Sequence, residues 1–209
     1  MGQLVVVEFL SVDGVMQGLG SPAEDTEGGF AHGGWGARYA EGIQQVLGPA
    51  GLDETDGYLF GRKTYEKMAA YWPHQPDSNP IAAHLNAAPK YVVSGTLTRP
   101  DWQHTEVISS DILDTVRDLK DTVEGDIAIL GSGELCAQLL SWDLVDEFRL
   151  FIHPLLLGTG KRQFRQLPDP KFLTLRAVSR TDLGTVALVY QVTHQSRPSA
   201  EEPKVSAGL

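Results

Sequence analysis

Two glycine turns carry the residues of this chain that are best suited to chemistry. Each turn follows a short apolar run and precedes a sequence that favours a helix: Gly61-Arg62-Lys63-Thr64 and Gly131-Ser132-Gly133-Glu134-Leu135. The first amides of a helix lack intrahelical partners and carry a partial positive charge, so each turn predicts a seat for an anion. Arg62 and Lys63 suit a terminal phosphate monoester, whereas small residues let the second turn close on a pyrophosphate. One dinucleotide could occupy both seats.

The second turn does not complete the G-x-G-x-x-G fingerprint of ordinary Rossmann domains. Its sixth position is Cys136, and no acidic residue stands about 20 residues further on. The later run Gly158-Thr159-Gly160-Lys161 also lacks the flanking residues of a P-loop. These mismatches favour a different α/β nucleotide-binding fold.

Two carboxylates near the first strand are candidates for the proton transfer that accompanies reduction of a C=N or C=O bond. Asp13 follows that strand, and we expect it to donate the proton or hold an amino group of the substrate, or else to form an Asp-Gly turn. Glu8 is the only charge within the strand. If buried, it would have a raised pKa suited to a proton donor; an edge position facing solvent is the alternative.

Aromatic residues supply candidates for binding a flat substrate. Residues 28–36 are rich in glycine and include Phe30 and Trp35, which predicts a mobile lid with stacking surfaces, or else a loop whose Trp35 packs on the core. Tyr65 could line the same pocket or belong to the core. The six histidines show no paired helical spacing, so no metal is predicted.

The elements that must position these residues alternate along the chain. Strands are expected at residues 4–10, 57–60, 90–94, 106–108, 126–130 and 145–153, and helices at 38–47, 62–70, 112–119 and 134–140, with a further turn or two over 81–86. A hairpin of residues 173–179 and 186–192 closes the domain and is expected to add antiparallel edge strands. Because the carboxyl ends of parallel strands share one edge of a sheet, both glycine turns should open on the same side.

Composition limits the remaining possibilities. The 209 residues suit one domain, residues 1–194, followed by a tail, 195–209, that is expected to be disordered. Seventeen basic against 27 acidic residues give a formal charge of -10, which argues against a nucleic-acid partner and confines anion binding to local patches such as Lys161-Arg162. With no signal peptide, no membrane-spanning run and one cysteine, a reducing cytoplasm is the expected location.

Five motifs in order, residues 8–15, 60–66, 91–94, 130–135 and 144–164, resemble the dihydrofolate-reductase-like superfamily, in the bacterial branch related to the reductase domain of riboflavin-biosynthesis deaminase-reductases. The resemblance spans residues 3–193. It implies a three-layer α/β fold with a mostly parallel central sheet, a C-terminal antiparallel hairpin and helices on both faces. It also implies the use of NADPH and, because members of the family often dimerise, a homodimer.

By the same resemblance, Arg62 and Thr64 would grip the adenosine phosphate, Ser94 and Gly95 would lie by the adenosine end, and residues 131–135 would cradle the pyrophosphate. From the residues alone, Arg62 could instead form a surface salt bridge and Ser94 could cap its strand.

The substrate is less defined by the resemblance. Gly131 stands where the pyrimidine reductases carry a glutamate, and only Glu41 lies near the place of the folate enzymes' acid. The leading hypothesis is therefore an NADPH-dependent reductase of a small heterocycle, pterin-like or pyrimidine-like. The alternative is a non-catalytic NADP(H)-binding module that acts as a sensor or an assembly partner.

Overall fold

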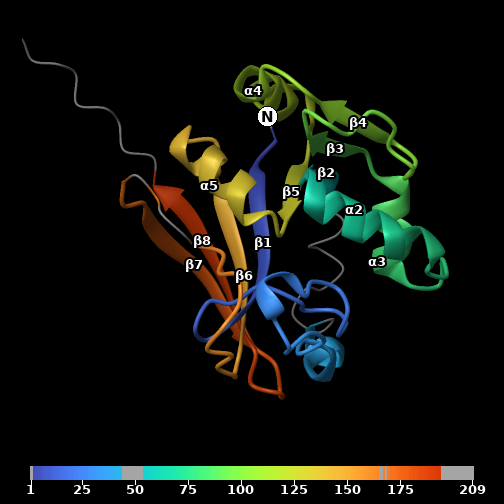
Figure 1. Ribbon diagram of the computed structural model, residues 1–209. Helices are drawn as coiled ribbons and strands as arrows, with labels where there is room; N and C mark the ends of the chain where they lie inside the picture. The colour runs from blue at the N-terminus through green and yellow to red at the C-terminus, as the bar shows by residue number, and fades with distance from the viewer. Residues whose placement is uncertain (1, 44–53, 165–166, 168, 194–209) are drawn as a thin grey trace, which may run out of the picture.

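The computed structural model describes residues 2–43, 54–164, 167 and 169–193. They form one eight-stranded sheet with the order β4-β3-β2-β5-β1-β6-β8-β7 (Figure 1). The strands are β1 (Leu4–Ser11), β2 (Thr55–Gly61), β3 (Lys90–Val93), β4 (Thr105–Ile108), β5 (Asp126–Leu130), β6 (Glu147–His153), β7 (Phe172–Arg180) and β8 (Val186–Thr193). The strands β4, β3, β2, β5, β1 and β6 run parallel, whereas β8 is antiparallel to both of its neighbours.

Helices cover both faces of this sheet, which makes three layers as predicted. They are α2 (Arg62–Tyr71), α3 (Pro80–Ala87), α4 (Ile112–Thr122) and α5 (Gly133–Ser141), with short 3-10 turns η1 (Glu27–Gly29), η2 (Ala37–Tyr39) and η3 (Trp72–His74). Side chains of a strand alternate between faces, so Leu59 packs with Val116 and Leu139 of α4 and α5. Its neighbour Phe60 packs with α2 and α3 on the other side. The buried apolar runs thus fix which face each helix covers.

Most predicted elements are confirmed to within a few residues, but three details differ. Residues 38–47 were expected to be one helix; η2 is a 3-10 turn, residues 40–43 are helical, and the rest of that range, like the tail 195–209, lies outside the described residues. Only one strand of the closing hairpin lies at an edge, because β8 is inserted between β6 and β7. The 3-10 turns were not predicted.

The edge strand β7 is unusually open. All nine of its residues are exposed, and Phe172, Leu175 and Val178 expose 57%, 50% and 62% of their surface. In Figure 1 β7 lies at the outer side of the sheet, beyond β8. Long apolar edge strands are usually covered in native proteins, so this surface is a candidate for association.

Candidate coenzyme and substrate site

The two glycine turns lie in direct contact at one edge of the sheet. Because β2 and β5 are neighbouring parallel strands, the turn that follows β2 meets the turn that follows β5. The amide of Gly61 donates a hydrogen bond to Ser132 Oγ at 3.0 Å, and Ser132 Oγ donates to Thr64 Oγ1 at 2.8 Å. The prediction that both turns open on one side is confirmed, and Ser132 is the side chain that joins them.

The backbone of the second turn is shaped to present its amides. Gly131 and Ser132 have φ of 63° and 64°, so two consecutive residues occupy the left-handed region, which is costly for serine. No side chain among the described residues caps the N-terminus of α2 or of α5. The first amides of both helices therefore remain free of side-chain caps at the place where the sequence predicts two anion seats.

The cations of the first turn are held by carboxylates. Arg62 Nη1 donates to both oxygens of Glu66, at 2.9 and 3.2 Å, in an exposed i,i+4 pair. Lys63 Nζ lies 3.4 Å from Glu27 Oε2. Exposed ion pairs of this kind are weak, so a phosphate could exchange for Glu66 at low cost. Phosphate binding by Arg62 and Lys63 stays a prediction.

Of the other residues expected near the coenzyme, Ser94 is bonded to its own turn, Gly95 is exposed and Leu135 is buried. Ser94 Oγ accepts hydrogen bonds from the amides of Thr96 and Leu97 at 3.2 and 2.9 Å, so it caps its strand, which was the alternative role. Gly95 is exposed, and a Cβ placed there would meet no atom within 4 Å. On α5 the side chain of Glu134 is exposed and that of Leu135 is buried in the core, so Leu135 can offer a ligand only its backbone.

Glu8 is a buried acid at the centre of the sheet. Its strand β1 lies between β5 and β6, which excludes the edge position that the sequence left open. Only 5% of the residue is exposed, and burial raises its pKa to about 8. Within the described part of the chain, its Oε2 has no hydrogen-bond partner. Glu8 is therefore protonated at neutral pH and can hold a proton beneath α5.

A second buried polar side chain, Gln163, lies near the Cys136 thiol. Gln163 is 3% exposed, and neither atom of its amide has a hydrogen-bond partner that meets standard criteria among the described residues. Burial raises the pKa of Cys136 to about 12, Glu8 adds to that rise, and Gln163 opposes it, so both side chains lie close to the thiol. A Cβ on Gly133 would lie 3.2 Å from Gln163 Oε1. This polar group thus sits directly under the second turn.

Asp13 has a structural position that argues against proton donation. Its carboxylate accepts hydrogen bonds from Ser11 Oγ at 2.7 Å and from the amides of Leu157 and Gly158 at 3.1 and 2.9 Å. These bonds lower its pKa to about 2, so the group is ionised at neutral pH. Asp13 ties the end of β1 to the segment after β6.

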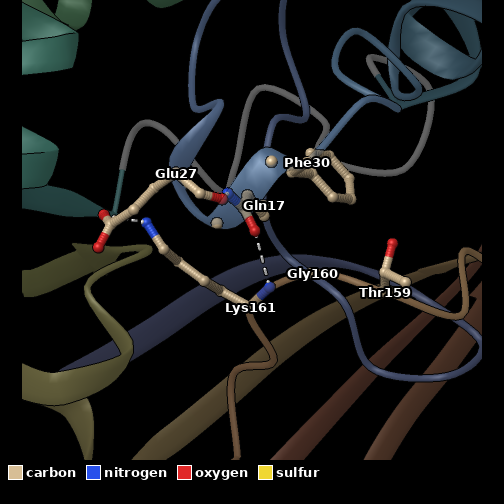
Figure 2. Close-up of a pocket in the computed structure, with 8 residues that line it drawn as sticks. Gln17, Glu27, Phe30, Thr159, Gly160 and Lys161 are labelled. Atoms are coloured by element: carbon tan, nitrogen blue, oxygen red, sulfur yellow. Dashed lines mark hydrogen bonds and ion pairs between the residues drawn. The ribbon is translucent and has the colours of Figure 1, made fainter.

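The aromatic residues proposed for the substrate lie mostly in the core. Trp35 and Phe30, 8% and 6% exposed, pack with Val15, and Trp35 Nε1 donates to the carbonyl of Gln17 at 2.7 Å. Tyr65 is 2% exposed and accepts a hydrogen bond from the amide of Trp102 at 3.0 Å. The structure thus gives Trp35 and Tyr65 the core positions weighed as alternatives, while Phe30 also lines a cavity of about 350 Å³ (Figure 2).

An aromatic stack at the carboxyl ends of β1 and β6 was missed. Phe9 stacks on Phe151 with 4.8 Å between ring centroids, and Tyr39 stacks on His153 at 4.7 Å. His153 Nδ1 is 2.9 Å from Thr185 Oγ1, and burial lowers the pKa of the imidazole to about 4, so it is neutral at pH 7. Alternation along β6 puts Phe151 and His153 on one face, but their meeting with Phe9 depends on a strand pairing that the sequence does not reveal.

The sheet order and the helices on both faces define a dihydrofolate-reductase-like α/β fold, in which two glycine turns meet at one edge of the sheet. The chain belongs to the RibD C-terminal domain family, which matches residues 3–189. It is 34% identical over 145 residues to the uncharacterised protein YyaP of Bacillus subtilis strain 168, covering 66% of this chain and 75% of YyaP.

Solved structures support the same fold. A Shewanella sp. PV-4 protein named for riboflavin biosynthesis superposes with a TM-score of 0.67 at 19% identity, over 93% of this chain and all of that one (100%). A pyrimidine reductase-like protein from Corynebacterium diphtheriae gives 0.60 at 16% identity, covering 93% of each chain. Dihydrofolate reductase from Enterococcus faecalis, solved with NADP(H), gives 0.53 at 16% identity, covering 92% of this chain and 98% of that one. At these identities the likeness establishes the fold alone.

Among the described residues, neither a membrane-spanning helix nor a cluster of metal ligands is found. None of their helices has the length and apolar character needed to cross a membrane. No group of three or more His, Cys, Asp or Glu side chains among them is arranged to hold a metal ion.

Proposed function

We propose that this protein is an NADPH-dependent reductase that transfers a hydride to a small heterocyclic substrate, pterin-like or pyrimidine-like. The observation that carries the proposal is the pair of uncapped helix N-termini joined through Ser132 at one sheet edge. Membership of the RibD C-terminal domain family supports it, as does the fold shared with a dihydrofolate reductase that binds NADP(H).

Each residue has a defined task in this proposal. The amides of residues 133–135 would hold the pyrophosphate, and Arg62, released from Glu66, would pair with the terminal phosphate. The coenzyme supplies the hydride. Glu8, protonated at neutral pH, would hold the proton that the reduced bond requires.

Binding should be measured before turnover. Titration with NADPH and NADH should show tighter binding of NADPH, and NADPH oxidation should then be followed with dihydropterins and ribityl pyrimidines. Glu8→Gln should retain the coenzyme and lose turnover, because it keeps the shape of the acid without its proton. A protein that binds neither coenzyme would refute the proposal.

A non-catalytic NADP(H)-binding module is the second candidate. It is favoured by the fixed, ionised state of Asp13 and by the core positions of Trp35 and Tyr65, which leave few groups free to act on a substrate. Tight NADPH binding without oxidation across the whole substrate panel would select this candidate over the reductase.

Assembly as a homodimer and a cytoplasmic location are also part of the proposal. The exposed apolar residues of β7 are the surface that a second copy would cover by pairing edge to edge. Sedimentation of the wild type and of Leu175→Arg should distinguish a dimer from a monomer, with the charge shifting the equilibrium toward monomer.

A further inference from the structure

Three lysines, two of them on α2, form ion pairs with two carboxylates. Asp25 Oδ2 lies 2.6 Å from Lys67 Nζ and 2.8 Å from Lys161 Nζ. Glu27 Oε2 lies 2.7 Å from Lys161 Nζ and 3.4 Å from Lys63 Nζ. The carboxylates belong to the loop after β1, whereas the lysines belong to α2 and to the segment after β6. We call these five side chains the lysine latch.

A buried glutamine builds the latch. Gln17, 4% exposed, donates through Nε2 to Asp25 Oδ1 at 3.0 Å and to the carbonyl of Glu27 at 2.9 Å. Its Oε1 accepts from the amide of Lys161 at 2.9 Å, as Figure 2 shows. One side chain therefore fixes the loop and the segment after β6 in register. The side chain of Asp25 is only 10% exposed, so its two ion pairs are partly shielded from water.

The charges of the latch do not cancel. Burial alone would raise the pKa of Asp25, but hydrogen bonds from Lys161 and Lys67 outweigh it and hold that pKa far below its usual value. Lys161 and Lys63 likewise lower the pKa of Glu27. Two carboxylate anions thus face three lysine cations. A phosphate dianion has several acceptor oxygens and could replace the two carboxylates as the partner of the lysines.

The latch adjoins both glycine turns. Lys63 follows Arg62 on the first turn of α2. Two residues after Lys161, Gln163 lies against Gly133, with its backbone oxygen 3.4 Å from the Cβ position there. A dinucleotide that spans the two turns would therefore bring its phosphates to the lysines.

We propose that Lys63, Lys67 and Lys161 form an anion site for phosphate groups of the coenzyme, and that Asp25 and Glu27 occupy this site as internal competitors until the coenzyme displaces them. The inference rests on the proposed function, since it concerns the same site. Coenzyme binding then breaks the ion pairs and frees the segment around η1 to rearrange. The latch lowers the affinity for every anion, so only a ligand that also engages the glycine turns opens it efficiently.

The test compares Asp25→Asn/Glu27→Gln with wild type by calorimetric titration with inorganic pyrophosphate and with NADPH. Removing the competitors should tighten pyrophosphate binding about tenfold, as expected for ion pairs of this exposure. The matched control is Glu106→Gln/Asp114→Asn, which removes the same charge from β4 and α4, at the end of the molecule opposite the loop after β1 (Figure 1). The control should leave pyrophosphate affinity unchanged.

The outcomes separate this inference from the proposed function. Equal pyrophosphate affinity in wild type and Asp25→Asn/Glu27→Gln overturns the latch even if NADPH binds. A gain for pyrophosphate with no NADPH binding in any variant supports Asp25 and Glu27 as competitors for an anion at the three lysines, and refutes the coenzyme as that anion together with the proposed function.

Two further measurements guard against variants that fold poorly. Glu27→Gln alone, at a side chain that is 58% exposed, should give a smaller gain in the same direction. In wild type, saturating pyrophosphate should raise backbone hydrogen exchange over residues 20–30 to the rate of the double variant. Unchanged exchange in this segment would contradict displacement.

Discussion

Ser132 offers the sharpest test of how the two turns are joined. Ser132→Ala removes the hydroxyl that accepts from Gly61 and donates to Thr64. A net hydrogen bond contributes about 0.5–1.5 kcal/mol, and the site is half-buried, so the free energy of unfolding should fall by about 1–2 kcal/mol. Ser132→Gly loses the same bonds but relieves the left-handed φ of 64°, which costs a residue with a Cβ about 1–2 kcal/mol. The glycine variant should therefore be the more stable of the two.

Urea denaturation at pH 7 measures this difference, with equal m values as the condition for comparing the variants. Titration with NADPH should show weaker binding by Ser132→Ala, because the second turn loses its anchor to β2. The reasoning is refuted if Ser132→Ala matches wild type in stability, or if Ser132→Gly is the less stable variant.

Four other outcomes follow from the site. Burial raises the pKa of Glu8 from its ordinary value of 4.5 to about 8, so the unfolded chain releases this proton at lower pH than the folded protein does. Stability should therefore fall as the pH rises between these values, by at most about 1.4 kcal/mol per pH unit, and Glu8→Gln should flatten this part of a pH series of urea melts. Asp13 has its pKa lowered from 3.8 to about 2, so its contribution is present above 3.8 and lost as the pH falls through 2; acid unfolding of Asp13→Asn should lack this component. Arg62→Ala should weaken NADPH by about 1–3 kcal/mol and NADH much less, and equal losses in titrations would exclude phosphate recognition by that side chain. Glu66→Gln should strengthen NADPH binding in the same titration by freeing Arg62.

Local sequence was sufficient for most strands and α-helices and for the two glycine turns. Apolar runs of period two marked the strands, and a glycine after a run marked each turn, because these signals depend only on neighbouring residues. The pair of Arg62 with Glu66 follows from helical spacing alone.

The contacts that could not be predicted from the sequence join residues that are far apart in the chain. Whether Glu8 is buried depends on β1 lying between β5 and β6, and the partners of Asp13 lie 144 and 145 residues away. Lys161 was recognised as part of a basic patch, but its carboxylate partner Asp25 stands 136 residues from it. Interactions of this kind require the fold before they can be recognised.

Trp35 gives this protein a built-in optical reporter. Its indole N–H donates to the carbonyl of Gln17 in the loop after β1, and its ring packs edge-on against that of His153, with 5.4 Å between the ring centroids. The indole therefore contacts both this loop and the end of β6. Indole emission shifts to longer wavelength in a wetter environment, and a loop that rearranges would carry Trp35 toward water. With the other three of the chain's four tryptophans replaced by phenylalanine, the colour of the remaining emission would follow loop opening in real time without any attached dye.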